Sequence, residues 1–140
     1  MGSCYNKIEI NSSLQDVWNC ICNFHDLSWA PNVIVSVTKA GDISGSNVGA
    51  KRVLNDAFHE TLTELNTENF SFKYSIDDGP GPLANGEVNN YIGTVQLSST
   101  NNGTLVEWSS SYESEQDNEV ANFCNPIYLA LLTDLKKSME

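Results

Sequence analysis

The hydrophobic pattern of this chain has one period in its central part and another at its end. From Val33, Val35 and Val37 to residue 112, apolar and polar side chains alternate in short segments, which is typical of strands with one buried face. Turns rich in glycine or asparagine separate the segments, so consecutive strands are expected to pair as antiparallel hairpins. Over residues 118–138, apolar side chains recur every three or four positions, which predicts one long helix.

The N-terminal part supplies one more strand and the connecting helices. Residues 4–10 alternate between apolar and polar positions, which predicts a strand. Residues 11–13, Asn-Ser-Ser, form a helix-capping sequence, and the apolar spacing that follows predicts an amphipathic helix of about three turns through residue 24. Residues 25–31 are expected to contain a second short helix that ends at Pro31.

The order of these elements predicts the fold class. One strand, one or two short helices, about six consecutive strands and a long helix indicate an α+β fold in a single domain, residues 1–140. A curved antiparallel sheet of about seven strands would wrap around the C-terminal helix, which is the only long apolar element able to cover its buried face. A cleft is therefore expected between sheet and helix. Pro126 lies inside the long helix and predicts a kink or a loosened turn near Asn122.

Charge and hydropathy limit the partners that can be expected. The formal net charge is -11, from 7 Lys and Arg against 18 Asp and Glu, and such a chain repels nucleic-acid phosphates and anionic lipids. There is no apolar run of about 20 residues and no signal-peptide pattern, so we expect a cytoplasmic protein without a membrane anchor. A monomer or a homodimer is expected. No cofactor and no metal site are expected, because none of the four cysteines has zinc-ligand spacing.

Two charged residues lie on the apolar side of their strands. Alternation places Arg52 on the same face as Leu54. It places Glu60 on the same face as Phe58 and Leu62. Because a short Asn-Asp turn joins the two strands, Arg52 and Glu60 could pair across the ladder. Three interpretations remain open: polar lining of a ligand cavity, acid–base catalysis, or a structural ion pair without chemistry.

Aromatic side chains are the other candidates for the cleft wall. Tyr74, Tyr91 and Trp108 share the inward face in this register, and each combines a large apolar body with one polar atom. Trp29 would either close one end of the cleft or pack against the first helix. Ordinary core packing is an alternative role for all of them. The helix side of the cleft would be formed by Phe123, Ile127, Tyr128 and Leu131.

Eight short motifs follow one another along the chain. They are, in order, Ile8-Glu9-Ile10, Val17-Trp18, Trp29-x-Pro31, Gly49-x-x-Arg52, Glu60-x-Leu62, Tyr74-Ser75-Ile76, Asn90-Tyr91 and Thr104-Leu105-Val106-Glu107-Trp108. In this order they resemble the START-like, or SRPBCC, superfamily and, within it, the polyketide cyclase/dehydrase group. The resemblance covers about residues 4–137, and plant abscisic-acid receptors and the onion lachrymatory-factor synthase are similar more distantly. It implies the helix-grip, or Bet v 1-like, fold, with a pocket between sheet and long helix for a small, largely apolar molecule.

The resemblance also implies roles for the two charged residues. In the synthase, an arginine and a glutamate at the motif positions of Arg52 and Glu60 serve in proton transfer. In the receptors, the same two strands supply polar groups that reach the ligand. Residues 55–57 are shorter than the receptors' gate loop, and residues 77–89 lack their latch motif, so hormone reception is not expected. Residues 77–89 are instead expected to form a flexible flap over the cleft mouth.

The leading functional prediction is binding of a small hydrophobic or amphipathic molecule in the cavity. The first alternative is a cyclase, dehydratase or isomerase-like enzyme, with Glu60 as acid or base and Arg52 stabilising a developing anion. The second is a protein-interaction module with a filled cavity. Fold alone does not decide between them, because the superfamily includes carriers, receptors and enzymes. The residues predicted to contact a ligand are Trp29, Arg52, Glu60, Tyr74, Tyr91, Trp108, Phe123 and Ile127.

Overall fold

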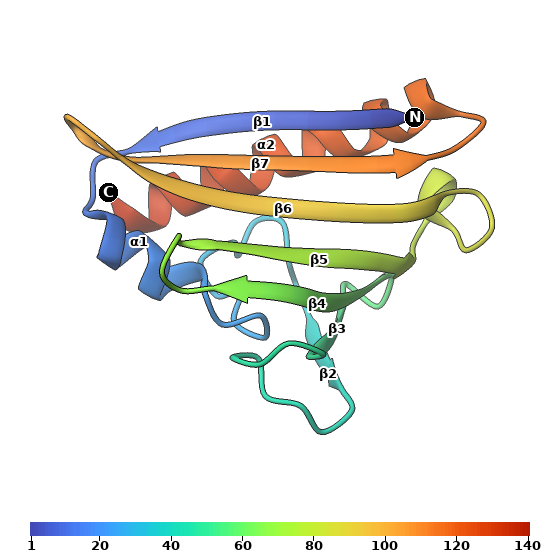
Figure 1. Cartoon of the computed structure of the whole chain (residues 1–140), viewed down its shortest axis with the longest axis horizontal. Coiled ribbons are helices and arrows are strands. Elements are labelled where there is room, and N and C mark those ends of the chain that lie inside the picture. The colour runs from blue at the N-terminus through green and yellow to red at the C-terminus, as the bar shows by residue number, and fades with distance from the viewer.

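The computed structural model describes all 140 residues and contains one seven-stranded antiparallel sheet with a long helix along one face (Figure 1). The helices are α1 (Leu14–Ile21), the short 3-10 helix η1 (Gly81–Leu83) and α2 (Asp117–Met139). The strands are β1 (Gly2–Ile10), β2 (Val37–Ala40), β3 (Lys51–Leu54), β4 (Phe58–Asn66), β5 (Ser71–Asp78), β6 (Asn89–Thr100) and β7 (Gly103–Glu113).

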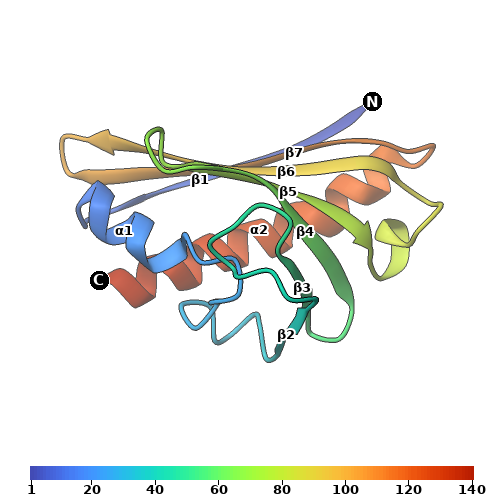
Figure 2. The ribbon, with the colours of Figure 1, turned by 60° about the horizontal axis from the view of Figure 1, so that its bottom comes forward.

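The sheet order is β1-β7-β6-β5-β4-β3-β2, so the strands from β2 to β7 are consecutive hairpins and β1 adds to the far edge. Figure 2 shows the sheet curving around α2, with β2 and β3 bent away from the plane of β1, β6 and β7. The predicted α+β helix-grip architecture, with about seven strands and a long C-terminal helix, is confirmed.

The turn between β3 and β4 sets the register of the strands that carry the two charged residues. Asn55 and Asp56 form this turn, and both have φ near 55°. Asparagine and aspartate tolerate this left-handed conformation better than other residues with side chains, and two such residues in succession make a tight hairpin turn. In the resulting register Arg52 lies directly opposite Glu60, the pairing that the sequence left possible.

The buried side of the sheet packs against both helices. The hydroxyl of Ser13 caps α1 by accepting the backbone N–H of Asp16 at 3.2 Å, and the helix buries Val17, Trp18 and Ile21. On α2 the buried apolar positions recur every three or four residues from Val120 to Leu135, as predicted. The helix continues through Pro126, which has no N–H to donate to the preceding turn.

Two elements differ from the prediction. Residues 25–31 form turns and not a second short helix, and Asp26 holds one of them by accepting the backbone N–H of Ser28 at 3.0 Å. The strand expected from Val33 begins only at Val37, and Val35 is 83% exposed. An alternating segment forms a strand only where a neighbouring strand pairs with it. Within residues 33–40, β3 pairs only with residues 37–40.

Side chains hold the segment before β2 in place of a strand ladder. Asn55 Nδ2 donates to the carbonyl oxygen of Val33 at 2.9 Å, and Asn55 Oδ1 accepts the backbone N–H of Val35 at 2.8 Å. On α2, the buried Asp134 accepts the backbone N–H of Asn32 at 2.8 Å and its Nδ2 at 3.0 Å. The loop between α1 and β2 is therefore tied to both the β3–β4 turn and α2.

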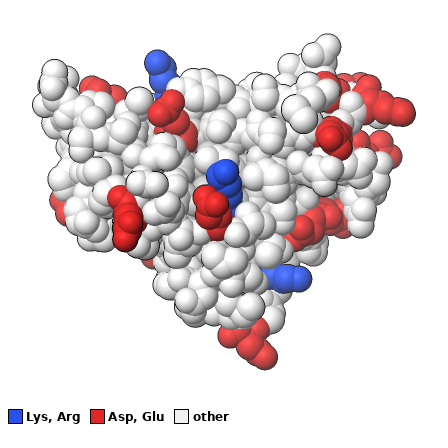
Figure 3. All heavy atoms as spheres, viewed as in Figure 1, with Lys and Arg blue, Asp and Glu red and all other residues white.

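The outer face of the sheet carries few charged side chains (Figure 3). Acidic groups gather at the end of the molecule where β7 leads into α2, and Glu113, Glu115, Asp117 and Glu119 follow one another there. None of the helices combines the length and the apolar character needed to cross a bilayer.

Candidate functional site

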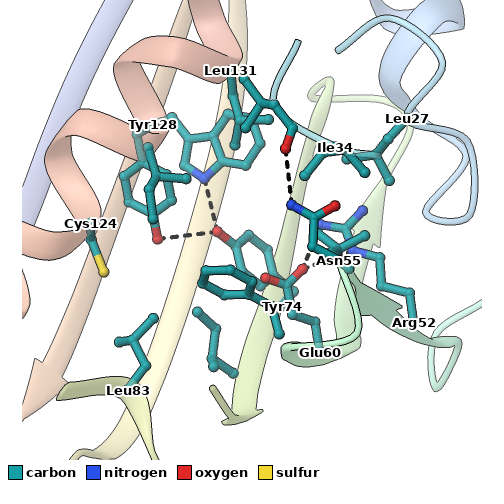
Figure 4. Close-up of a pocket in the computed structure, with 16 residues that line it drawn as sticks. Leu27, Ile34, Arg52, Asn55, Glu60, Tyr74, Leu83, Cys124, Tyr128 and Leu131 are labelled. Carbon is teal, nitrogen blue, oxygen red and sulfur yellow. Dashed lines mark hydrogen bonds and ion pairs between the residues drawn. The ribbon is translucent and has the colours of Figure 1, made fainter. Parts of the chain in front are cut away.

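A cavity of about 200 Å³ lies between the sheet and α2 (Figure 4). Hydrophobic side chains make up 13 of its 16 lining residues, so its wall is mainly apolar. In Figure 4, Cys124, Tyr128 and Leu131 of α2 form one side, and Arg52 and Glu60 lie on the other. The volume is below the roughly 300–1,000 Å³ of common ligand sites, so any occupant must be small.

Arg52 and Glu60 form a buried ion pair that lines this cavity. Arg52 Nε donates to Glu60 Oε1 at 2.8 Å, and Arg52 Nη2 lies 2.7 Å from the same oxygen. The side chains are only 4% and 6% exposed. Arg52 Nη1 also donates to the carbonyl oxygen of Phe24 at 2.9 Å, and the guanidinium carbon lies 3.8 Å from the centroid of the Phe24 ring. The arginine is thus held by a carboxylate, a carbonyl and an aromatic face.

The second carboxylate oxygen of Glu60 has no such partner. Both contacts from Arg52 end on Oε1, and Oε2 accepts no hydrogen bond from a protein group. Figure 4 shows the carboxylate among the side chains that line the cavity. Burial raises the pKa of Glu60 above its ordinary 4.5; Arg52 offsets only part of this rise, and the charge of Asp77 adds to it. A carboxyl group with a raised pKa and a free oxygen therefore lies within an apolar cavity.

A chain of hydrogen-bonded aromatic side chains crosses from the sheet to α2. Trp108 Nε1 donates to the Tyr74 hydroxyl at 2.9 Å, and the Tyr74 hydroxyl donates to that of Tyr128 at 3.2 Å. The Tyr128 hydroxyl is also hydrogen-bonded to that of Tyr91. Burial raises the pKa of all three tyrosines, so their hydroxyls stay protonated near neutral pH. The polar tips of four large side chains thus satisfy one another inside the protein.

Only some of the residues that the sequence predicted for ligand contact line the cavity. Tyr91 lies behind the cavity wall, with its hydroxyl bonded to Tyr128. Trp29 packs in the core, its ring centroid 6.4 Å from that of Trp108, and does not line the cavity. Phe123 also lies outside the lining and packs against the ring of Phe58. The predicted residues that do line the cavity are Arg52, Glu60, Tyr74, Trp108 and Ile127.

Residues outside the regular elements complete the wall, and sequence reasoning missed them. Leu27, Val33 and Ile34 come from the loop after α1, and Asn55 comes from the β3–β4 turn. Leu83 of η1 is 1% exposed and also lines the cavity, so the segment expected to form a flap contributes to its wall. Hydrophobic periodicity does not identify such residues, because loops have no period. The only signal was apolar side chains within turn-rich segments.

Comparison with known proteins places the chain in a family. It matches, over residues 1–140, the family described as polyketide cyclase / dehydrase and lipid transport. The chain belongs to this family. The family membership that the motifs predicted is therefore confirmed. No match was found among curated proteins.

Solved structures show the same fold. A protein of Nitrosospira multiformis is 39% identical, with a TM-score of 0.95 over 99% of this chain and 96% of that one. The protein XoxI of Bacillus cereus is 29% identical, with a TM-score of 0.81 over 99% of this chain and 96% of that one. Major latex-like protein 151 of Panax ginseng is 15% identical, with a TM-score of 0.78 over 99% and 97%, and shares the fold alone.

Proposed function

We propose that the protein binds a small hydrophobic or amphipathic molecule in the cavity between the sheet and α2. The observation that carries the proposal is a cavity of about 200 Å³ with a mainly apolar wall and one charged pair on it. Protein interiors normally pack densely, and each methyl-sized void costs about 1 kcal/mol. A cavity of this size is therefore a cost to stability that a binding role would explain. The family description, which includes lipid transport, supports the same role.

The structure suggests a division of labour in the proposed site. Glu60 would supply the main polar contact, because one of its oxygens has no protein partner. Arg52 would mainly position Glu60, since three of its five N–H groups already serve Glu60 and Phe24. Tyr74, Trp108 and Ile127 would form apolar walls.

Filling the cavity tests this proposal. Ile127→Trp adds an indole ring where α2 lines the space, and we expect it to weaken binding of an apolar probe such as toluene at least tenfold. Native mass spectrometry of the purified protein should likewise find a co-purifying small molecule in the wild type and not in the variant. The matched control is Leu129→Trp, because Leu129 lies on the same helix, is 52% exposed and does not line the cavity. Equal binding by wild type and Ile127→Trp would contradict the proposal.

A second candidate function is acid–base catalysis of the cyclase, dehydratase or isomerase kind. The free oxygen and raised pKa of Glu60 favour it, because a general acid or base works best with a pKa near the working pH. Three of the five N–H groups of Arg52 are engaged with Glu60 and Phe24, which leaves two for its predicted role as anion stabiliser.

The two functions differ in what Glu60→Gln would do. In a binding protein, the same molecule should co-purify with wild type and variant. In an enzyme, the variant should retain the substrate and the wild type should yield the product. Mass spectrometry would show dehydration as the loss of one water and isomerisation as a changed retention time at equal mass. Identical molecules in both samples would rule out catalysis by Glu60, and no bound molecule in either would favour an interaction module.

A further inference from the structure

Most of the hydrogen-bond acceptors on the cavity wall are bonded to protein groups. The Tyr74 hydroxyl accepts from Trp108 and donates to Tyr128. Both polar atoms of the Asn55 side chain are bonded to backbone groups. Glu60 Oε2, on a side chain that is only 6% exposed, accepts no hydrogen bond from the protein. This oxygen is not fully enclosed by protein atoms, so a donor in the cavity can reach it. A hydrogen bond to a carboxylate oxygen contributes more to binding than one to a neutral group that the protein already satisfies.

The charges around this oxygen disfavour an ionic ligand. A ligand carboxylate would bring a second negative charge to Glu60, and three of the five N–H groups of Arg52 are already directed at Glu60 and at the Phe24 carbonyl. A ligand ammonium would have to lose its water beside the guanidinium of Arg52, which is 2.7 Å from Glu60 Oε1. A neutral hydroxyl avoids both penalties. It donates to the carboxylate and can accept from the protonated acid, so it suits Glu60 in either state.

The size and wall of the cavity limit the rest of the ligand. A volume of about 200 Å³ is small beside the roughly 300–1,000 Å³ of common ligand sites. This size favours a compact ligand over a long acyl chain or several fused rings. Aromatic rings surround the space, with Trp108 and Tyr128 stacked at 5.4 Å and Tyr74 edge-on to Trp108 at 80°. Such a wall favours a single ring, which can pack in offset or edge-to-face contacts.

We infer that the cavity selects a small neutral ring compound with a hydroxyl group, a phenol or a cyclic alcohol, and that this hydroxyl bonds to Glu60 Oε2. The inference rests on the proposed binding function and adds the chemical class of the ligand to it.

Four probes that differ in one substituent test the inference. They are 4-methylphenol, toluene, 4-methylbenzoate and 4-methylbenzylamine, titrated calorimetrically near neutral pH against the whole chain. We expect 4-methylphenol to bind at least about tenfold more tightly than toluene, the effect of one hydrogen bond to a charged group. The benzoate and the benzylamine should bind at least about tenfold more weakly than the phenol. Tighter binding of either ion than of the phenol would overturn the inference.

Variants then assign the selection to Glu60. Replacing Glu60 alone by leucine would leave Arg52 buried without its partner, so both are replaced in Arg52→Leu/Glu60→Leu, which keeps the site apolar. This double variant should bind 4-methylphenol and toluene with affinities within about threefold of each other. Glu64→Leu, an exposed position on the same strand, is the control and should keep the wild-type preference.

The outcomes separate the inference from the function on which it rests. If toluene binds as tightly as 4-methylphenol to the wild type, the inference fails while cavity binding stands. If the double variant keeps the preference for the phenol, Glu60 is not its origin and the inference also fails. If none of the four probes binds, the proposed binding function fails together with the inference.

Discussion

Arg52→Leu is expected to lower the free energy of unfolding by about 3–5 kcal/mol, the usual cost of removing one partner of a buried ion pair. The guanidinium contributes contacts at 2.8 Å and 2.7 Å to Glu60 Oε1, and no other basic side chain pairs with this carboxylate. The leucine would leave Glu60 in the apolar cavity with no opposite charge nearby. The loss should be visible in urea denaturation followed by circular dichroism.

The double variant Arg52→Leu/Glu60→Leu should recover most of that stability. Replacing both members of a buried pair by apolar residues is often neutral or stabilising, because no charge is left without a partner. We expect the double variant to unfold within about 1 kcal/mol of the wild type, measured in the same urea titration. Glu64→Leu on the exposed side of β4 serves as the surface control. If the double variant loses as much stability as the two single variants together, Arg52 and Glu60 do not stabilise the protein as a pair.

The pairing of Arg52 with Glu60 could be predicted from sequence because two local rules act on the same strands. Alternation assigns each residue to a face, and the short turn over residues 55–57, with Asn55 and Asp56 at positive φ, limits the register of the hairpin. The long helix and the strand order could be predicted for the same kind of reason, since period and turn chemistry are properties of neighbouring residues. These local rules were enough to predict the fold and to bring Arg52 and Glu60 together as candidates.

The rest of the cavity could not be predicted, because it depends on contacts between distant segments. The hydrophobic period places Tyr91 on the inner face of the sheet. Its hydroxyl is, however, hydrogen-bonded to that of Tyr128 on α2, and Tyr91 does not line the cavity. Trp29 follows no period, and its position comes from packing against Trp108. The loop that carries Val33 is held by Asp134 and Asn55, side chains remote from it in sequence. A pattern within one segment contains no information about such partners.

Gly93→Ala is expected to destabilise the protein by about 3 kcal/mol, the upper part of the range for overpacking a core. Gly93 lies opposite Tyr74 in the ladder between β5 and β6, and the tyrosine ring lies over the glycine. A Cβ atom at residue 93 would overlap the ring carbons of Tyr74, which is 1% exposed. The ring would have to shift, which would disturb the hydrogen bonds of its hydroxyl with Trp108 and Tyr128.

The double variant Gly93→Ala/Tyr74→Leu tests this explanation, because leucine at residue 74 is smaller than tyrosine. Tyr74→Leu alone should destabilise by removing the ring and its hydrogen bonds, but it also removes the atoms with which the new methyl group collides. The double variant should therefore be about 1–2 kcal/mol more stable than the sum of the single effects predicts, in urea titrations of all four proteins. Additive effects would show that Gly93 is required for a reason other than the position of Tyr74. The same variants connect stability with binding: because Tyr74 lines the cavity, Gly93→Ala should also weaken binding of 4-methylphenol, although residue 93 itself does not line it.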